Sequence, residues 1–398
     1  MSNKQYSNGI SLSKSLILLL SVAGGVSVAN IYYNQALLAD IAKSFHETSQ
    51  TIGLLSTFTQ LGYALGLFFF VPLGDIKEKK KLIVSLLLAV AFSLLGVATA
   101  QSLIWIFAAS LAVGLTTVVP QIIIPLAAEL SKPTERGRVV GTIVSGLLFG
   151  ILLARTVAGY VGETFGWRYM FGFAAILMSL LAFVLNWKLP KTKPTVKLSY
   201  KEVLLSIIKI SRKYPTLKEA SIIAAMMFGA FSVFWTTLTF LLEGHPYEMN
   251  SSQAGLFGLI GVAGALGAPL IGRFNDRVNP KTLVLACISI GLISYVCFYF
   301  LGMSVAGLIV GIILLDLGVQ GAQVSNQTRV QSLSPSEGSR LNTIYMVSNF
   351  SGGAIGSLLG SFAWSLFGWK GVCVLGFTMV FIALYTCLFF NKKVTSSP

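Results

Sequence analysis

The chain has 398 residues, of which 55% are hydrophobic and only 11% charged, and its mean hydropathy is +0.78. Soluble domains carry about 25% charged residues, so this composition excludes an ordinary soluble globule. The formal net charge of +15 would suit a nucleic-acid partner only if the cations gathered on one surface, and they are instead distributed between apolar runs.

Apolar runs long enough to cross a bilayer recur along the whole chain. A membrane-spanning helix needs about 20 such residues, and the sequence predicts twelve helices of this kind. The predicted spans are 16–38, 51–73, 82–100, 103–130, 139–162, 168–188, 218–242, 253–272, 282–301, 305–331, 341–364 and 370–390. The first run is too long for the core of a signal peptide, so we expect it to be retained.

Polar residues interrupt several spans in patterns that favour a cavity lining. On the tenth span, Asp316, Gln320, Gln323 and Gln327 are spaced i, i+4, i+7 and i+11, which places them on one helix face about 16 Å long. Lipid cannot satisfy such groups, so we expect this face to meet protein or water. Single aromatic residues in such patterns could also pack or anchor at the membrane interface. The predicted substrate cavity is formed by Asn30, Tyr33, Asn34, Gln121, Trp235, Gln320, Gln323 and Asn349.

Two charged residues lie deep inside predicted spans, where a charge is costly and marks function. Arg155 falls about 16 residues into the fifth span and Asp316 about 11 residues into the tenth, and the helix rise places both near mid-membrane. We predict that they face the cavity and either pair or share substrate and proton handling, with Asp316 as the proton carrier. A purely structural ion pair is the alternative.

The positive charges follow alternate connections. Of the 29 Lys and Arg residues, 25 lie on one side, whereas Lys43, Arg168 and Lys370 lie on the other and Arg155 is within a span. Because cytoplasmic loops are enriched in Lys and Arg, we expect a multi-pass protein of the plasma (inner) membrane with both termini in the cytoplasm. The basic charge then reports orientation and not a nucleic-acid partner.

An internal repeat relates the two parts of the chain. A shift of 202 residues brings the Pro-x-Glu-x-x-Arg run at 133–138 onto 335–340, and the Phe-Gly-Trp run at 165–167 onto 367–369. The repeat predicts an all-α membrane protein with 12 transmembrane helices in two pseudo-symmetric six-helix bundles, an architecture common in secondary transporters. The predicted halves are 1–189 and 218–398, joined by a basic cytoplasmic linker at 190–217.

Glycines recur along three spans. In the fifth and eleventh spans small residues repeat every four positions from Gly146 and from Gly352, and the eighth span is also rich in glycine. Such stripes let helices approach closely. They are interpreted either as static packing or as seams along which the halves slide.

The loops after the second and eighth spans carry a family motif. The first reads Gly74-Asp75-Ile-Lys-Glu-Lys79, and the second begins at Gly272 and ends in Asp276-Arg277. With the repeat, this resembles the major facilitator superfamily, and in particular its bacterial proton-coupled exporters of drugs and metabolites. The resemblance implies a latch that closes the cytoplasmic side, with the residues Asp75, Arg138, Asp276, Arg277 and Arg340.

The resemblance and the pattern together predict a secondary active transporter that exports small organic molecules by alternating access, coupled to protons. An importer or facilitator of a neutral nutrient, such as a sugar or amino acid, is the alternative, and a non-transport sensor or scramblase is a third class. No nucleophile–base cluster marks an enzyme, and the spans lack the ligands of a metal site. We therefore expect a monomer in the lipid bilayer with a small-molecule substrate, protons as partner and no cofactor.

Overall fold

The computed structural model describes residues 12–132, 134–192, 199–266, 278–334 and 337–390. All regular elements in these ranges are helices, and ten helical segments among them are long and apolar enough to cross a membrane. The prediction of an all-helical membrane protein is therefore confirmed. The helices are α1 (Lys14–Ala29), α2 (Tyr33–Phe45), α3 (Ser49–Phe69), α4 (Leu73–Ile76), α5 (Lys79–Ala98), α6 (Leu103–Thr116), α7 (Val119–Leu130), α8 (Arg136–Phe165), α9 (Trp167–Lys188), α10 (Tyr200–Lys213), α11 (Pro215–Glu243), α12 (Ser251–Leu266), α14 (Pro280–Leu301), α15 (Val305–Gln331) and α16 (Gly338–Phe389).

The surface of the helical bundle carries large apolar side chains. Ile104 is 83% exposed and Phe92 is 79% exposed, which would be costly in water because exposed apolar area opposes folding. A bilayer removes this cost, since the lipid tails are as apolar as the side chains. The pattern of exposure agrees with the hydropathy of the chain.

Two of the predicted spans are broken in their middle. The first span is divided into α1 and α2 by a tight turn at 30–32, and the fourth is divided into α6 and α7 at 117–118. Pro120 explains the second break, because its ring removes a backbone donor and clashes with the carbonyl four residues earlier. Neither break is part of the sequence prediction.

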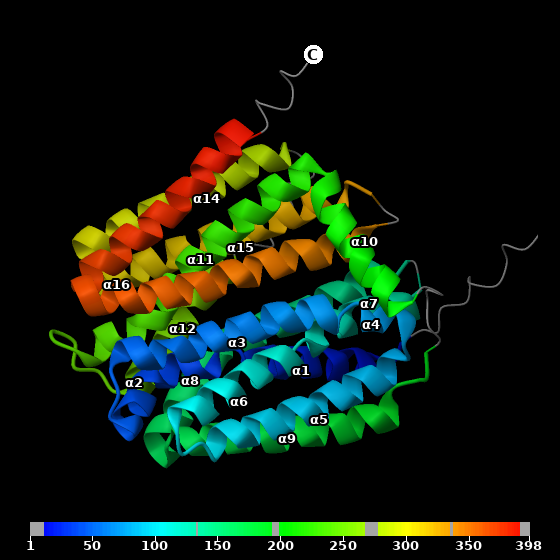
Figure 1. The fold of residues 1–398 in the computed structure, drawn as a ribbon, viewed down its shortest axis with the longest axis horizontal. Helices are drawn as coiled ribbons and strands as arrows, with labels where there is room; N and C mark the ends of the chain where they lie inside the picture. Colours follow the sequence, from blue (N-terminus) through cyan, green and yellow to red (C-terminus); the bar gives the residue numbers. More distant parts are fainter. Residues whose placement is uncertain (1–11, 133, 193–198, 267–277, 335–336, 391–398) are drawn as a thin grey trace, which may run out of the picture.

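The repeat is visible in the turns between neighbouring spans. Gly166 joins α8 to α9 with φ of +99°, and Gly368 lies inside the 52-residue helix α16 with φ of +60°. Figure 1 shows α16 doubling back, its orange first part running beside its red second part. Glycine adopts such positive φ angles without a Cβ clash. Gly166 and Gly368 are 202 residues apart, so they are related by the repeat.

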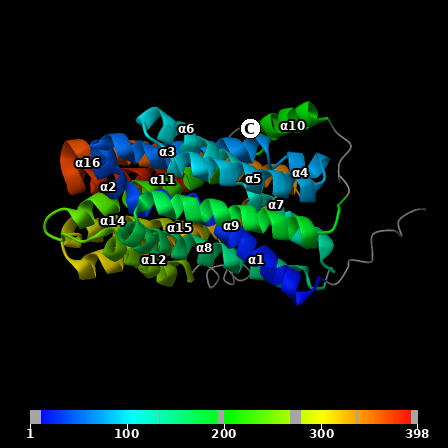
Figure 2. The same cartoon turned by 90° about the horizontal axis from the view of Figure 1, so that it is seen from below.

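Helices of the two sequence halves are segregated in space. In Figure 1, α11, α14, α15 and α16 occupy the upper part and α1, α3, α5, α6, α8 and α9 the lower part. Two seams join them, one between α3 and α16 and one between α8 and α12, and Figure 2 shows these pairs on opposite sides of the molecule.

The glycine stripes of α8 and α16 pack helices of the same half. A Cβ on Gly150 would meet the backbone of Gly25 in α1, and a Cβ on Gly356 would meet the backbone of Gly229 in α11. For these two stripes static packing is therefore the correct interpretation. The stripe of α12 differs, because Gly255 lies against the backbone of α8 in the other half.

The linker contains a helix that the sequence analysis did not predict. Helix α10 begins with a capping box, in which Ser199 and Glu202 exchange side-chain and backbone hydrogen bonds. Figure 1 shows α10 running across the end of the bundle instead of along it. The next helix, α11, starts at Pro215, three residues before its predicted start.

Candidate transport pathway

Arg155 is buried between the two halves. Its side chain is on α8 and only 3% exposed, and its Nε donates a 2.9 Å hydrogen bond to Oε1 of Gln35 on α2. The guanidinium carbon lies 3.9 Å from the ring centre of Trp235 on α11 and 4.9 Å from that of Tyr32. Stacking on aromatic faces stabilises a desolvated cation, so Arg155 links both halves through Trp235.

Asp316 lies opposite, on α15, and is only 2% exposed. Its carboxylate interacts with Arg155 through space. Oδ2 of Asp316 and Nη2 of Arg155 have no hydrogen-bond partner among the described residues. The structure therefore brings the two predicted charges into one buried region without closing an ion pair between them.

Helix α12 packs its glycine face against the residues that carry both charges. A Cβ on Gly258 would lie 3.0 Å from Cβ of Arg155, and a Cβ on Gly261 would lie 3.3 Å from Oδ1 of Asp316. A side chain at either position would displace a charged group. The two glycines thus make room for Arg155 and Asp316 along one face of α12.

At one end of the molecule, charged residues join the two halves. Lys43 on α2 pairs with Glu243 on α11 at 2.6 Å, and the Ser251 hydroxyl donates a short hydrogen bond to Asp40. Beside them lies a cavity of about 600 Å³, which Lys43 and Glu243 help to line. These contacts tie α2 of the first half to α11 and α12 of the second.

A buried hydroxyl–amide network joins the halves along the other seam. Nε2 of Gln60 on α3 donates to the Ser357 hydroxyl at 2.9 Å, and the Ser232 hydroxyl donates to Oε1 of Gln60 at 3.1 Å. Thr236 and Ser357 share a further hydrogen bond of 2.9 Å. Sequence reasoning missed Gln60, although a single amide in the middle of the predicted span 51–73 is a signal that points to it.

The opposite end of the molecule contains a cavity of about 390 Å³ with apolar and polar side chains in its wall. It lies between α3, α4 and α7 of the first half and α15 and α16 of the second, and Gln121, Gln327 and Asn342 contribute amides to its wall. Nε2 of Gln327 donates to Oδ1 of Asn342 at 2.7 Å. The wall also holds the charged side chains of Asp75 and Lys79, so it offers donors and acceptors for a small polar molecule.

Of the residues predicted to form a latch, Asp75 lines this cavity and Arg340 lies near Asp75. Oδ2 of Asp75 accepts from the Ser339 hydroxyl at 3.5 Å, and Arg340 is near enough to interact with Asp75 through space. Arg138 lies elsewhere and lines a separate groove with Lys14. The remaining latch residues, Asp276 and Arg277, lie outside the described residues.

The other predicted cavity residues are distributed over two further places. Asn30 donates to Sδ of Met178 at 3.3 Å, and Asn34 donates to Thr59 at 3.1 Å, so both are held inside the first half. The remaining residues of this prediction are Tyr33, which is buried, Gln320, which is half-buried, and Gln323 and Asn349, which border a closed gap between α11, α15 and α16.

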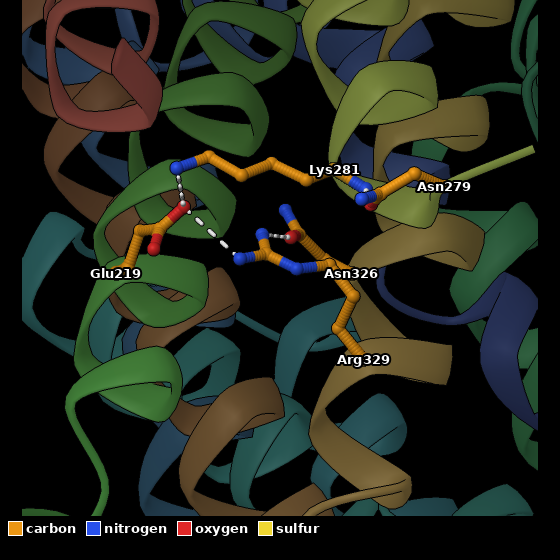
Figure 3. Close-up of polar contacts among 5 residues, drawn as sticks. All are labelled: Glu219, Asn279, Lys281, Asn326 and Arg329. Carbon is orange, nitrogen blue, oxygen red and sulfur yellow. Dashed lines mark hydrogen bonds and ion pairs between the residues drawn. The ribbon is translucent and has the colours of Figure 1, made fainter. Parts of the chain in front are cut away.

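Sequence reasoning also missed a cluster of charges in the second half (Figure 3). Glu219 on α11 is fully buried, and its Oε1 lies 3.0 Å from Nη2 of Arg329 and 3.7 Å from Nζ of Lys281. Asn326 accepts a 2.9 Å hydrogen bond from Arg329. The cluster fixes α11, α14 and α15 to one another. The signal was the lone acid at the start of the predicted span 218–242.

Within the described ranges, no group of three or more His, Cys, Asp or Glu side chains is arranged to hold a metal ion. The buried polar groups described above are mostly amides and hydroxyls. Amides and hydroxyls can bind a small molecule reversibly through hydrogen bonds.

Comparison with known proteins agrees with this architecture. The chain is 43% identical over 373 residues to a putative uncharacterized transporter, YgaY, of Escherichia coli strain K12, and the match covers 94% of this chain and 95% of that one. It is 25% identical over 375 residues to a probable sugar efflux transporter of Helicobacter pylori, covering 90% of each.

A solved structure with the same fold is that of a peptide transporter, POT, in complex with sulfate. It superimposes with a TM-score of 0.79 at 13% identity, over 99% of this chain and 98% of that chain. The profile of the Major Facilitator Superfamily matches residues 20–357. The chain therefore belongs to the Major Facilitator Superfamily of membrane transporters.

Proposed function

We propose that this transporter exports small, uncharged or amphiphilic organic molecules in exchange for protons, by alternating access. In this proposal α16 supplies two spans and α12 another, giving twelve spans in two six-helix halves, 1–189 and 218–398. The chain acts as a monomer in the bacterial inner membrane, with both termini in the cytoplasm.

Arg155 and Asp316 are the observation that carries the proposal. Both are buried, they come from different halves, and each keeps a polar atom without a hydrogen-bond partner among the described residues. A carboxylate of this kind can take up a proton or face the guanidinium. Since the two charges attract each other only when Asp316 is ionised, protonation of Asp316 weakens the contact between the halves.

The two ends of the molecule support alternating access. The end that holds Lys43 and Glu243 is bridged by an ion pair, whereas the other end contains the cavity of about 390 Å³, to whose wall several amides contribute. The distribution of Lys and Arg favours this second end as cytoplasmic. A molecule would enter there and leave after the bridge between Lys43 and Glu243 has broken.

Export is favoured over import by the relatives. A probable sugar efflux transporter of Helicobacter pylori matches 90% of this chain. The amides at the cavity wall suit hydroxyl-bearing substrates, because one amide side chain can both donate and accept.

The deciding experiment measures collapse of a pH gradient in inverted membrane vesicles. A panel of drugs, sugars and amino acids is added to vesicles that contain the wild type or Asp316→Asn. We expect at least one compound to collapse the gradient with the wild type only. Glu248→Gln is the matched control, because it removes a carboxylate that is 78% exposed, and it should behave like the wild type.

Two results would contradict the proposal. If Asp316→Asn still couples the compound to protons, the carrier is another group. If a labelled solute equilibrates across the membrane and no compound moves protons, the protein is an importer or facilitator, and Asp316 is a structural partner of Arg155.

A further inference from the structure

Helix α10 has apolar residues on two faces, although only one face packs on the protein. Val203, Ile207 and Ile210 are buried against the bundle. On the outer face, Leu205 and Ile208 are each 47% exposed. An amphipathic helix on a water-exposed surface would carry polar residues there, so the outer face needs its own explanation.

Cations flank the exposed apolar pair. Lys201, Leu205, Ile208 and Arg212 are spaced i, i+4, i+7 and i+11, which places them in one line along the helix. Lys209 is exposed beside this line. The acid of the helix, Glu202, is engaged by the N-cap at Ser199. The outer face therefore presents two apolar side chains among three cations.

The position of α10 puts this face at the membrane boundary. The Tyr200 hydroxyl donates a 2.9 Å hydrogen bond to the carbonyl of Phe69, the last residue of α3. Leu61, Leu65 and Phe69 form an exposed apolar row on α3, between 38% and 40% exposed. Figure 1 shows α10 lying across the end of the spanning helices, and Figure 2 shows it at the edge of the bundle. Since that row marks a lipid-facing surface, α10 lies where hydrocarbon meets water.

We propose that the outer face of α10 binds anionic phospholipids of the adjacent leaflet. Leu205 and Ile208 enter the boundary of the acyl chains, as the apolar side of an interfacial helix does. Lys201, Lys209 and Arg212 extend over that boundary and contact lipid phosphates. This inference is independent of the substrate and of proton coupling.

Charge decides among the possible occupants. A second copy of the chain would bring its own three cations against these, which repel each other. Zwitterionic lipid would accommodate the apolar pair but would gain little from the cations. Anionic lipid satisfies both features of the face.

The test uses the full-length protein in nanodiscs with an environment-sensitive fluorophore on Ile208→Cys. Wild-type protein treated with the dye gives the background, since Cys287, Cys373 and Cys387 are buried and Cys297 is half-buried. Quenching by brominated phosphatidylglycerol is compared with quenching by brominated phosphatidylcholine at the same mole fraction. We expect phosphatidylglycerol to quench at least about twofold more, because each Lys or Arg near an anionic surface attracts it appreciably.

Charge reversal and salt separate headgroup binding from simple immersion. In the labelled protein, Lys209→Glu combined with Arg212→Glu should abolish the excess quenching by phosphatidylglycerol. Lys132→Glu, an exposed lysine after α7, is the matched control and should retain it. High salt should reduce the excess without any substitution.

Several results would overturn the proposal. Equal quenching by the two lipids would mean that the face contacts lipid but does not prefer an anionic headgroup. Absence of quenching by either lipid would place the face in water. If quenching of the dye fell as the protein concentration rose, and did not depend on lipid composition, a second copy of the chain would cover the face.

Discussion

The two halves share a sequence repeat but differ at the centre of the membrane. In the first half, the spans that contain residues 30–32 and 117–118 are broken, whereas their repeat-related counterparts α11 and α15 are continuous. Broken helices leave backbone donors and acceptors free at mid-membrane, where many transporters hold their substrates. The second half instead contributes the buried acids, Asp316 within α15 and Glu219 near the start of α11, whereas the buried Arg155 belongs to the first half.

Single residues account for much of this difference. Pro120, which breaks the fourth span, corresponds to Ala322 in the tenth, and alanine is the best helix former. At the other break, Asn30 corresponds to Ser232, whose hydroxyl bonds to Gln60 across the seam. The repeat thus preserves the order of the helices, whereas single residue differences decide which spans are broken and which are continuous.

The same division holds for a pair of repeat-related lysines. Lys79 pairs with Glu129 at 2.7 Å, and that carboxylate is 37% exposed. Its counterpart Lys281 shares the fully buried Glu219 with Arg329. Glu219 is fully buried and holds two cations, whereas Glu129 holds one cation that also interacts with Asp75, so the cost of losing each carboxylate should differ.

The largest predicted effect tests this pair. Glu219→Ala leaves two cations without their buried anion and should lower the free energy of unfolding by about 3–5 kcal/mol. Glu129→Ala leaves one cation, Lys79, whose side chain is only 4% exposed but which also interacts with Asp75, so it should cost less, about 1–3 kcal/mol. Thermal unfolding of the purified protein in detergent, followed by intrinsic fluorescence, measures both variants. Equal shifts in melting temperature would contradict the predicted difference between Glu219 and Glu129.

A proline exchange tests the origin of the broken span. Ala322→Pro would introduce into α15 a break like the one between α6 and α7. It should lower the free energy of unfolding by about 3 kcal/mol or more. Pro120→Ala should be tolerated in stability but should slow transport, since it lets α6 continue into α7. Melting temperature and initial transport rate are read for both variants. A Pro120→Ala protein with unchanged transport would show that the break itself is dispensable.

The seam helix α12 offers a smaller contrast. A Cβ on Gly264 would lie 2.6 Å from the carbonyl oxygen of Ile313 and 2.8 Å from Cβ of Asp316, whereas a Cβ on Gly261 would lie 3.3 Å from the Asp316 carboxylate and meet no backbone atom as closely. Gly264→Ala should therefore cost about 1–3 kcal/mol as overpacking. Gly261→Ala should leave stability nearly unchanged but alter proton coupling, because it displaces Asp316. Identical phenotypes would mean that neither contact is specific.

Hydropathy was enough to predict an all-helical membrane protein, because spans follow from length and apolarity alone. The charges Arg155 and Asp316 could be selected because buried charge is rare. The partners of Arg155 could not be predicted, since Gln35 and Trp235 come from helices distant in sequence. The same holds for Gln60, whose partners are more than 170 residues away.

The smallest predicted effect compares the two ends of α10. Its start is held by a neutral hydrogen bond from Tyr200 to the first half, whereas its end is held by Lys213 and the Tyr214 hydroxyl, both bound to Glu337 of the second half. Lys213 and then Tyr214 hold the pKa of Glu337 below its usual range. A depressed carboxylate pKa means that the contact is present at neutral pH and is lost as the pH falls through that lowered value.

Hydrogen exchange of the α10 amides in the reconstituted protein measures this difference. On acidification, after correction for intrinsic exchange rates, protection near Lys213 should fall as Glu337 is protonated. At the start of α10 the Tyr200 hydrogen bond is neutral, and only the Glu202 carboxylate of the capping box can be protonated there. Glu337→Gln should reduce protection near Lys213 already at neutral pH and remove its dependence on pH. Tyr200→Phe is the matched control, since it weakens the other end equally at every pH. If both ends open together in the wild type, α10 is held as one unit by Val203 and Ile207, and its ion pair contributes nothing of its own.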